Sequence, residues 1–217
     1  MPKVYPNAIA IAPTAAAAPQ PQPQVSKPSI SDGQVQVLTV WKKSLLFNCK
    51  GFTVFDSKGN LVFRVDNYSS SNKTHILLMD ATGKPLLTIR RKKLTLADNW
   101  VVYNGETDVN PLYTVKKHVN LLNSRWLAYV QTGCNNGSNK NVVYQIDGSY
   151  AQRCCTVYDE KKRVVAEIKR KESVAGVSFG GDVFRLVVQP DMDPAVAMAL
   201  VILLEQMFGS RWSPPSN

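Results

Sequence analysis

The last apolar run of the chain, residues 194–208, constrains the fold more than any other feature. Every residue of Ala195–Leu204 is apolar, so a helix here would have no side suited to water. Asp193 can cap such a helix, Pro194 suits its first turn, and Gly209 can end it. At about 1.5 Å per residue the run spans ~21 Å, whereas the hydrocarbon core of a bilayer is ~30 Å thick. We therefore expect the helix to lie inside the protein.

The chain before this helix is a series of short apolar and β-branched runs, spaced as in barrels and sandwiches. Residues 56–59 and 80–83 begin with Asp and end with Gly, as type I turns prefer, and Asn104-Gly105 and Asp147-Gly148 predict two-residue hairpins. About twelve strands are expected. They lie at residues 35–41, 52–55, 61–65, 75–79, 86–90, 100–103, 112–115, 126–130, 142–146, 154–158, 164–168 and 183–188.

A helix that is apolar on every face needs a wide closed barrel around it rather than a flat sandwich. We therefore predict a mainly β fold, a closed twelve-stranded antiparallel barrel enclosing a hydrophobic C-terminal helix at about residues 194–208. Residues 52–65 also align with residues 155–168, each a strand, an Asp-led turn and a second strand. Either an internal duplication or convergent hairpin chemistry explains this similarity.

Residues 1–33 differ in composition from the rest of the chain, being rich in proline, alanine and glutamine. We predict a disordered, partly polyproline-II tail there, followed by a single barrel domain at residues 34–217. Prolines bracket the apolar residues 8–12, which leaves that run shorter than a signal peptide requires. We therefore expect a protein that is not secreted and has no transmembrane span. The expected location is cytoplasmic, peripheral at the plasma membrane, or nuclear, with the four cysteines reduced and buried.

Motifs for catalysis or metal binding do not stand out. His75 and His118 are the only histidines, which makes a multi-histidine metal site implausible. No CxxC pair, Walker loop or GxSxG elbow is present. We expect neither an enzyme nor a cofactor.

The charge is more informative. The formal net charge is +10, and because residues 1–33 contain only Lys3, Lys27 and Asp32, the barrel carries +9 of it. Lysines on a barrel can serve solubility and edge protection, or together they can attract an anionic partner such as a lipid surface. Nucleic acid is the less favoured partner because no nucleic-acid-binding motif is present. The clusters are residues 42–43, 90–93, 116–117, 161–163 and 169–171.

Within the second cluster, alternate residues of a strand share a face. Arg90 and Lys92 can therefore converge on one phosphate group while Arg91 and Lys93 face away. These two residues are our predicted lipid-headgroup site.

Several segments of the chain, and the order in which they follow one another, resemble the plant LURP-one-related proteins over roughly residues 30–210. The resemblance rests on Phe-Thr-Val-Phe-Asp at residues 52–56, Leu-Met-Asp at 78–80, Leu-Thr-Ile-Arg-Arg-Lys at 87–92, and the ending at 181–193 before the apolar helix. It implies the tubby-like architecture shared with tubby proteins and phospholipid scramblases, and no catalytic motif. Relatives are linked to basal plant defence, to phosphoinositide-tethered transcription regulators and to lipid scrambling. Arg90 and Lys92 are similar to the basic pair with which tubby domains hold a phosphoinositide headgroup.

Three functions stay open at this point. The first is a peripheral module that binds phosphoinositides or other anionic membrane lipids. The second is a protein-interaction or regulatory scaffold with unknown protein partners, and the third is scramblase-like lipid handling. We expect the protein to be a monomer.

Overall fold

The computed structural model describes residues 33–46, 49–68, 75–92, 99–118, 126–133, 141–172 and 180–209. The predicted disordered tail lies outside these ranges apart from Gly33, so its disorder stays a prediction.

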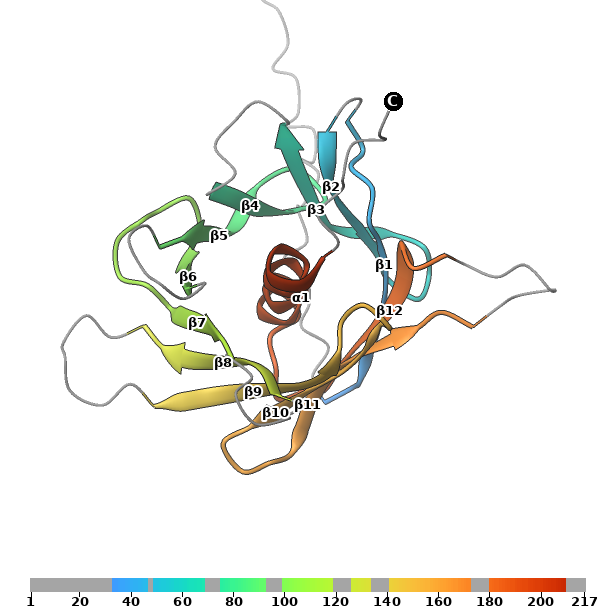
Figure 1. The fold of residues 1–217 in the computed structure, drawn as a ribbon. Helices are drawn as coiled ribbons and strands as arrows, with labels where there is room; N and C mark the ends of the chain where they lie inside the picture. Colours follow the sequence, from blue (N-terminus) through green and yellow to red (C-terminus); the bar gives the residue numbers. More distant parts are fainter. Residues whose placement is uncertain are drawn as a thin grey trace, which may run out of the picture. The chain divides into compact units, whose positions relative to one another are not determined.

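Twelve antiparallel strands form one closed barrel around a helix (Figure 1), as predicted. Each strand pairs with its neighbours in sequence, and β1 pairs with β12 to close the barrel. All twelve predicted strands are confirmed, most of them extended by one or more residues. The strands are β1 (Gln36–Trp41), β2 (Cys49–Phe55), β3 (Leu61–Tyr68), β4 (His75–Asp80), β5 (Pro85–Arg91), β6 (Asn99–Asn104), β7 (Tyr113–Lys117), β8 (Trp126–Thr132), β9 (Val142–Ser149), β10 (Cys154–Asp159), β11 (Val164–Arg170) and β12 (Val183–Val188).

The strand pairing places apolar side chains on the inner wall. Leu38 lies opposite Leu186, and Val40 opposite Phe184, where β1 and β12 close the barrel. All four are buried, and the residues between them along each strand are more exposed. The period of two expected of a half-buried strand thus selects one inward face around the barrel.

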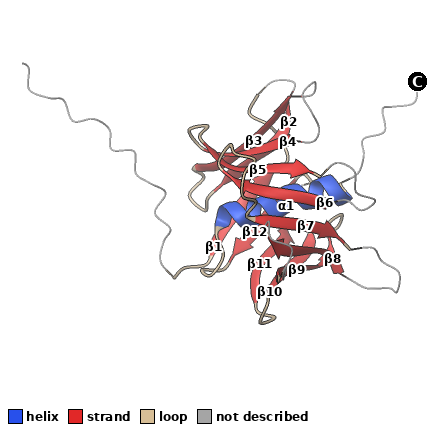
Figure 2. Ribbon diagram, turned by 90° about the vertical axis from the view of Figure 1, so that its left-hand side faces the viewer, coloured by secondary structure: helices blue, strands red, loops and turns tan. Residues whose placement is uncertain are grey.

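The helix α1 (Pro194–Phe208) runs lengthwise through the barrel (Figure 2), with the predicted bounds. Its buried positions cover every face, including all residues of Val196–Leu204. The Asp193 carboxylate accepts a hydrogen bond from the backbone N–H of Ala195 at 2.7 Å, as predicted for the N-cap. No helix in the described ranges combines the length and apolar character that a bilayer crossing requires.

Gly209 ends the helix through close approach rather than through a left-handed conformation, because its φ is −60°. Its N–H donates to the Glu205 carbonyl at 2.9 Å. A Cβ at this position would lie 2.4 Å from that carbonyl oxygen, so a side chain here would force the helix end to shift.

The Asp-led turns are confirmed at both predicted sites. The N–H of Gly59 donates to the Asp56 carbonyl, and that of Gly83 to the Asp80 carbonyl, each at 3.1 Å. The two glycines have φ of 86° and 92°, where other residues are strained. The hairpin between β10 and β11 repeats this geometry with Lys162 in the glycine position at φ 61°, which extends the similarity of residues 52–65 and 155–168 to backbone conformation.

Two other predicted hairpins are wrong. Asp147-Gly148 lies inside β9, and the chain turns at residues 150–153 instead. A Cβ on Gly148 would lie 2.2 Å from the Cys154 carbonyl oxygen, so the glycine serves close strand approach. Asn104 does end β6, but β7 begins only at Tyr113, after a long connection.

The enclosed helix generates a direct test. Leu200 is 2 % exposed, so Leu200→Lys places an unpaired charge in the core and should unfold the protein. The matched control is Gln206→Lys, which adds the same charge at an exposed position of the same helix and should fold normally. Circular dichroism melting curves measure both. A Leu200→Lys protein that melts like the wild type would contradict an enclosed helix.

Candidate functional site

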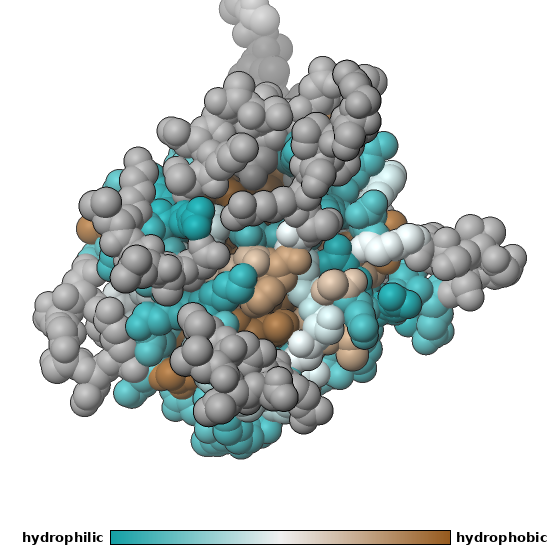
Figure 3. All heavy atoms as spheres, in the orientation of Figure 1, coloured by the Kyte–Doolittle hydropathy of each residue, from teal (hydrophilic) through white to brown (hydrophobic). Residues whose placement is uncertain are grey.

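One end of the barrel collects basic residues from strands far apart in the sequence. Because all neighbouring strands are antiparallel, the ends of odd-numbered strands and the starts of even-numbered strands meet there, together with the end of α1. Figure 3 looks onto this end, where hydrophilic side chains surround an apolar centre. We name the end the basic rim. Its basic residues are Lys42, Lys43, Lys50, Arg90, Arg91, Lys92, Lys116, Lys117, Arg153, Lys169, Arg170 and Lys171.

The basic clusters recognised in the sequence therefore separate into two groups. Those at residues 42–43, 90–92, 116–117 and 169–171 come together at the basic rim. The cluster at residues 161–163 lies in the turn at the opposite end, where Arg163 pairs with Asp159 at 2.7 Å and Asp191 at 3.0 Å. The opposite end is thus balanced by turn carboxylates, and the charge of the barrel is asymmetric along its axis.

The predicted site residues Arg90 and Lys92 lie at this end of β5. Arg90 is on the outer wall, opposite His75 of β4, and its guanidinium pairs with Asp108 at 3.0 Å. Arg91 is opposite the buried Trp100, which confirms that Arg90 and Arg91 belong to different faces. Lys92 is exposed just past the strand, and its N–H donates to the Asn99 carbonyl at 2.8 Å. Lys93 lies outside the described residues.

A buried ionic cluster closes the barrel behind the rim. The Glu205 carboxylate, on the last turn of α1, pairs with the Lys42 ammonium at 2.7 Å and the Arg153 guanidinium at 3.6 Å. A carboxylate at a helix C-terminus is disfavoured by the helix dipole, and the two cations offset this cost. Lys117 also places a positive charge at the helix C-terminus, because its ammonium donates a hydrogen bond to the Met207 carbonyl at 3.0 Å.

Arg153 is the centre of this cluster, although it is not among the predicted site residues. Its guanidinium lies 4.2 Å from the ring of Tyr150 and 4.6 Å from that of Phe184. Its Nε donates to the Gly181 carbonyl at 2.8 Å. Burial and the neighbouring Glu205 carboxylate raise the pKa of the Tyr150 hydroxyl, so it stays neutral. A lone arginine before two cysteines carries no motif, and only its contacts show its role.

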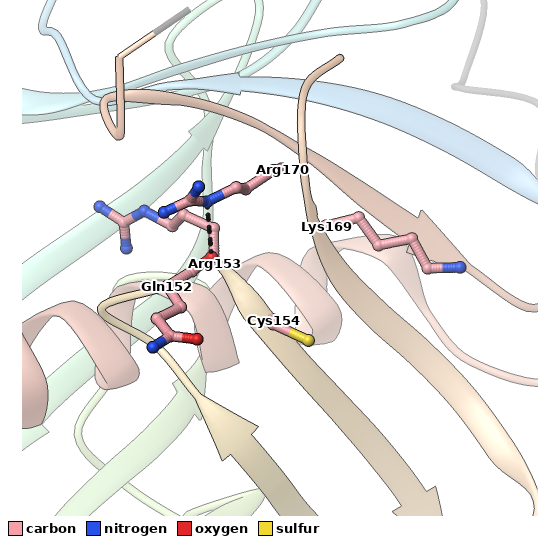
Figure 4. A pocket seen from close by; sticks show the side chains of 5 residues that line it. All are labelled: Gln152, Arg153, Cys154, Lys169 and Arg170. Carbon is pink, nitrogen blue, oxygen red and sulfur yellow. Dashed lines mark hydrogen bonds between the residues drawn. The ribbon is translucent and has the colours of Figure 1, made fainter.

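An open hollow of about 550 Å³ lies outside this cluster, between the start of β10 and the end of β11 (Figure 4). The Arg170 Nε donates to the Gln152 carbonyl at 3.1 Å across it. Cys154 is exposed in the hollow, contrary to the expectation of buried cysteines, whereas Cys155 is buried and burial raises its thiol pKa to about 12. The two neighbours face opposite sides of the strand, as predicted.

No group of three or more histidine, cysteine or acidic side chains that could hold a metal occurs among the described residues. What the rim offers chemically is a set of cations on a rigid frame. Such a surface suits anionic groups.

The buried cluster predicts strong coupling between its members. The side chains of Arg153 and Glu205 are 9 % and 12 % exposed. Arg153→Met leaves Lys42 as the remaining cation beside the Glu205 carboxylate and also removes the bond to the Gly181 carbonyl, so it should cost about 3 kcal/mol of unfolding free energy. Removing both charges in Arg153→Met/Glu205→Met should restore most of that loss. Urea unfolding of the two single variants and the double variant measures the coupling. Additive effects would contradict it.

Comparison with known proteins gives a consistent assignment. The sequence profile of the family described as LURP-one-related matches residues 36–205. The Arabidopsis thaliana protein LURP-one-related 8 is 56 % identical over 178 residues, covering 80 % of this chain and 88 % of that protein. LURP-one-related 17 of the same plant is 45 % identical over 190 residues, covering 81 % and 85 %.

A solved structure shares the architecture. The X-ray structure of an Arabidopsis thaliana protein superposes with a TM-score of 0.62 at 26 % identity, covering 84 % of this chain and 96 % of that one. The segment that matches the family profile, residues 36–205, includes every strand and most of α1. This chain therefore belongs to the LURP-one-related family.

Proposed function

We propose that this barrel is a non-enzymatic module that binds the anionic surface of a membrane peripherally, through the basic rim. The observation that carries the proposal is the gathering of the clusters at residues 42–43, 90–92, 116–117 and 169–171 at one barrel end. Each basic residue near an anionic leaflet contributes ~1 kcal/mol, so several acting together give reversible binding. The enclosed helix keeps its apolar residues from the lipid, and the long-range attraction is electrostatic.

Arg90 and Lys92 are the proposed headgroup contacts within this surface. Both partners of the Arg90–Asp108 ion pair are solvent-exposed, with 38 % and 61 % of their side-chain surface accessible. An exposed pair of this kind contributes little to stability. A lipid phosphate, which carries more charge and more acceptor oxygens, can therefore replace Asp108 at low cost. Phosphoinositide headgroups suit the site better than singly charged lipids for the same reason.

Family membership extends the proposal to a cellular role. LURP-one-related relatives are linked to basal plant defence, and the related tubby-like barrels to phosphoinositide tethering. A cytoplasmic barrel held at the plasma membrane by anionic lipids would lie where its release or recruitment can regulate a defence response.

Scramblase-like lipid handling is the weaker alternative. The inner wall and α1 fill the interior of the described barrel with buried side chains, which include Leu200 and Phe184. An acyl chain would have to displace the helix, at a large cost in apolar burial. A protein-interaction scaffold without a lipid ligand is the remaining alternative, and vesicle binding separates it from our proposal.

Co-sedimentation with vesicles tests the proposed function. Wild-type protein should bind vesicles that contain phosphatidylserine or a phosphoinositide, ignore pure phosphatidylcholine vesicles, and dissociate as salt is raised. Arg90→Ala/Lys92→Ala should bind about tenfold more weakly, because ~1.4 kcal/mol corresponds to a factor of ten and each cation contributes ~1 kcal/mol.

The matched control is Lys58→Ala/Lys84→Ala, which removes the same charge from exposed turns at the opposite end. It should bind like the wild type. Wild-type protein that ignores anionic vesicles at low salt would refute the proposed function and favour the scaffold. Equal loss in both double variants would show that net charge, rather than this end of the barrel, governs binding.

A further inference from the structure

The connection that follows β1 exposes large apolar side chains at the basic rim. Trp41, Leu45 and Leu46 are 41 %, 53 % and 37 % exposed, whereas the inward residues of the same strand are buried. Side chains of this size that stay in water beside each other mark interaction surfaces more often than isolated ones do. The described part of this connection comprises residues 42–46.

Hydrogen bonds hold the connection in this conformation. The Ser44 hydroxyl is buried, donates to Asp66 Oδ1 at 2.5 Å and accepts the Leu46 N–H at 3.0 Å. The other Asp66 oxygen accepts from Arg64 Nε at 2.7 Å and pairs with its Nη2 at 2.6 Å. Thr53 Oγ1 adds a bond to the Lys43 carbonyl at 2.9 Å. These hydrogen bonds therefore fix the backbone conformation that leaves Leu45 and Leu46 exposed.

Gly51 allows this arrangement sterically. A Cβ there would lie 1.7 Å from the Val65 carbonyl oxygen and 3.3 Å from the Ser44 Cβ. The close approach of β3 to β2 requires a glycine here, and the same position leaves room for Ser44 to pack against β2. Leu45 and Leu46 thus follow a residue that packs directly against the barrel wall.

Two lysines belong to the same segment as the apolar side chains. The Lys43 ammonium lies 5.1 Å from the centre of the Trp41 ring, and Lys42 links the same segment to Glu205. Tryptophan prefers the boundary between headgroups and acyl chains, and lysine can extend its ammonium to the headgroups beside it. Exposed leucines in the same segment suit the apolar layer next to these groups. A neutral protein groove would make no use of the Lys43 charge beside Trp41.

We infer that residues 41–46 are the element that inserts into an anionic bilayer, with Leu45 and Leu46 in the acyl region and Trp41 at the interface. The inference rests on the proposed function and deepens it, because it adds an apolar anchor to an electrostatic contact. It also sets the orientation of the barrel, with the basic rim facing the membrane and the turns of residues 56–59 and 80–83 facing away.

The test compares two exposed apolar pairs on intact protein. Leu45→Ser/Leu46→Ser should bind phosphatidylserine vesicles at least about tenfold more weakly at constant salt, because buried apolar area is lost. Val35→Ser/Val37→Ser changes exposed apolar residues at the start of β1, at the opposite end of the barrel, and should bind like the wild type. Surface substitutions of this kind usually change stability little, which melting curves verify.

A second readout follows Trp41 directly. Vesicles should shift the tryptophan emission of the wild type to shorter wavelength, and brominated lipids should quench it, while Trp41→Phe should lose most of both responses. Wild type that fails to bind anionic vesicles overturns this inference together with the proposed function. Wild type that binds, with undiminished binding by the leucine double variant or no Trp41 response, overturns the inserting element alone. Equal weakening of the two double variants overturns it as well.

Discussion

The constraint on which the whole structure depends is a helix that has no polar face. Buried residues cover every side of α1 over Val196–Leu204, so the strands must surround it completely. The barrel depends equally on the helix, because twelve strands enclose more space than their own inward side chains can fill. Leu186 and Phe184 of the wall and Leu200 of the helix belong to one continuous core. Neither part would be stable without the other.

Because the interior is apolar, the charged side chains lie on the outer wall and at the two ends of the barrel. At the opposite end from the rim, the turn carboxylates have structural duties: Asp56 accepts the N–H groups of Lys58 and Asn60, and hydrogen bonds from Asn60 lower its pKa. At the rim, the helix ends with its carbonyl groups exposed to cations, as Lys117 shows. The charge asymmetry of the barrel thus follows from how turns and a helix terminus are satisfied.

The regular elements could be predicted because their signals are local. Strand alternation, Asp-led turns and the apolar run each lie within a few residues, and the capping of α1 by Asp193 is equally local. Two-residue turn signals were less reliable, because Gly148 is required by a neighbouring strand rather than by its own turn. Local sequence does not distinguish these two reasons for a glycine.

The candidate site was predictable only in part. Basic clusters were visible in the sequence, but antiparallel order had to be known before those at residues 42–43 and 169–171 could be placed together. The contact of Arg153 with Glu205 joins residues about fifty positions apart and leaves no pattern in either segment. The hydrogen bond of Ser44 to Asp66 joins residues 22 positions apart and likewise leaves no pattern in the sequence.

The rim cations therefore divide by what they already contact. Lys42, Arg153 and Lys117 are held by the end of the helix, so their charge is largely used inside the protein. Lys43 lies beside the indole of Trp41, and Arg90 pairs only with an exposed carboxylate among its described ion-pair partners. The first group, which the helix end holds, stabilises the fold. The second group, Lys43 and Arg90, could contact an anionic surface without the loss of a buried ion pair. The peripheral membrane attachment that we propose would therefore be reversible, because it needs only the second group of cations and leaves the barrel unchanged.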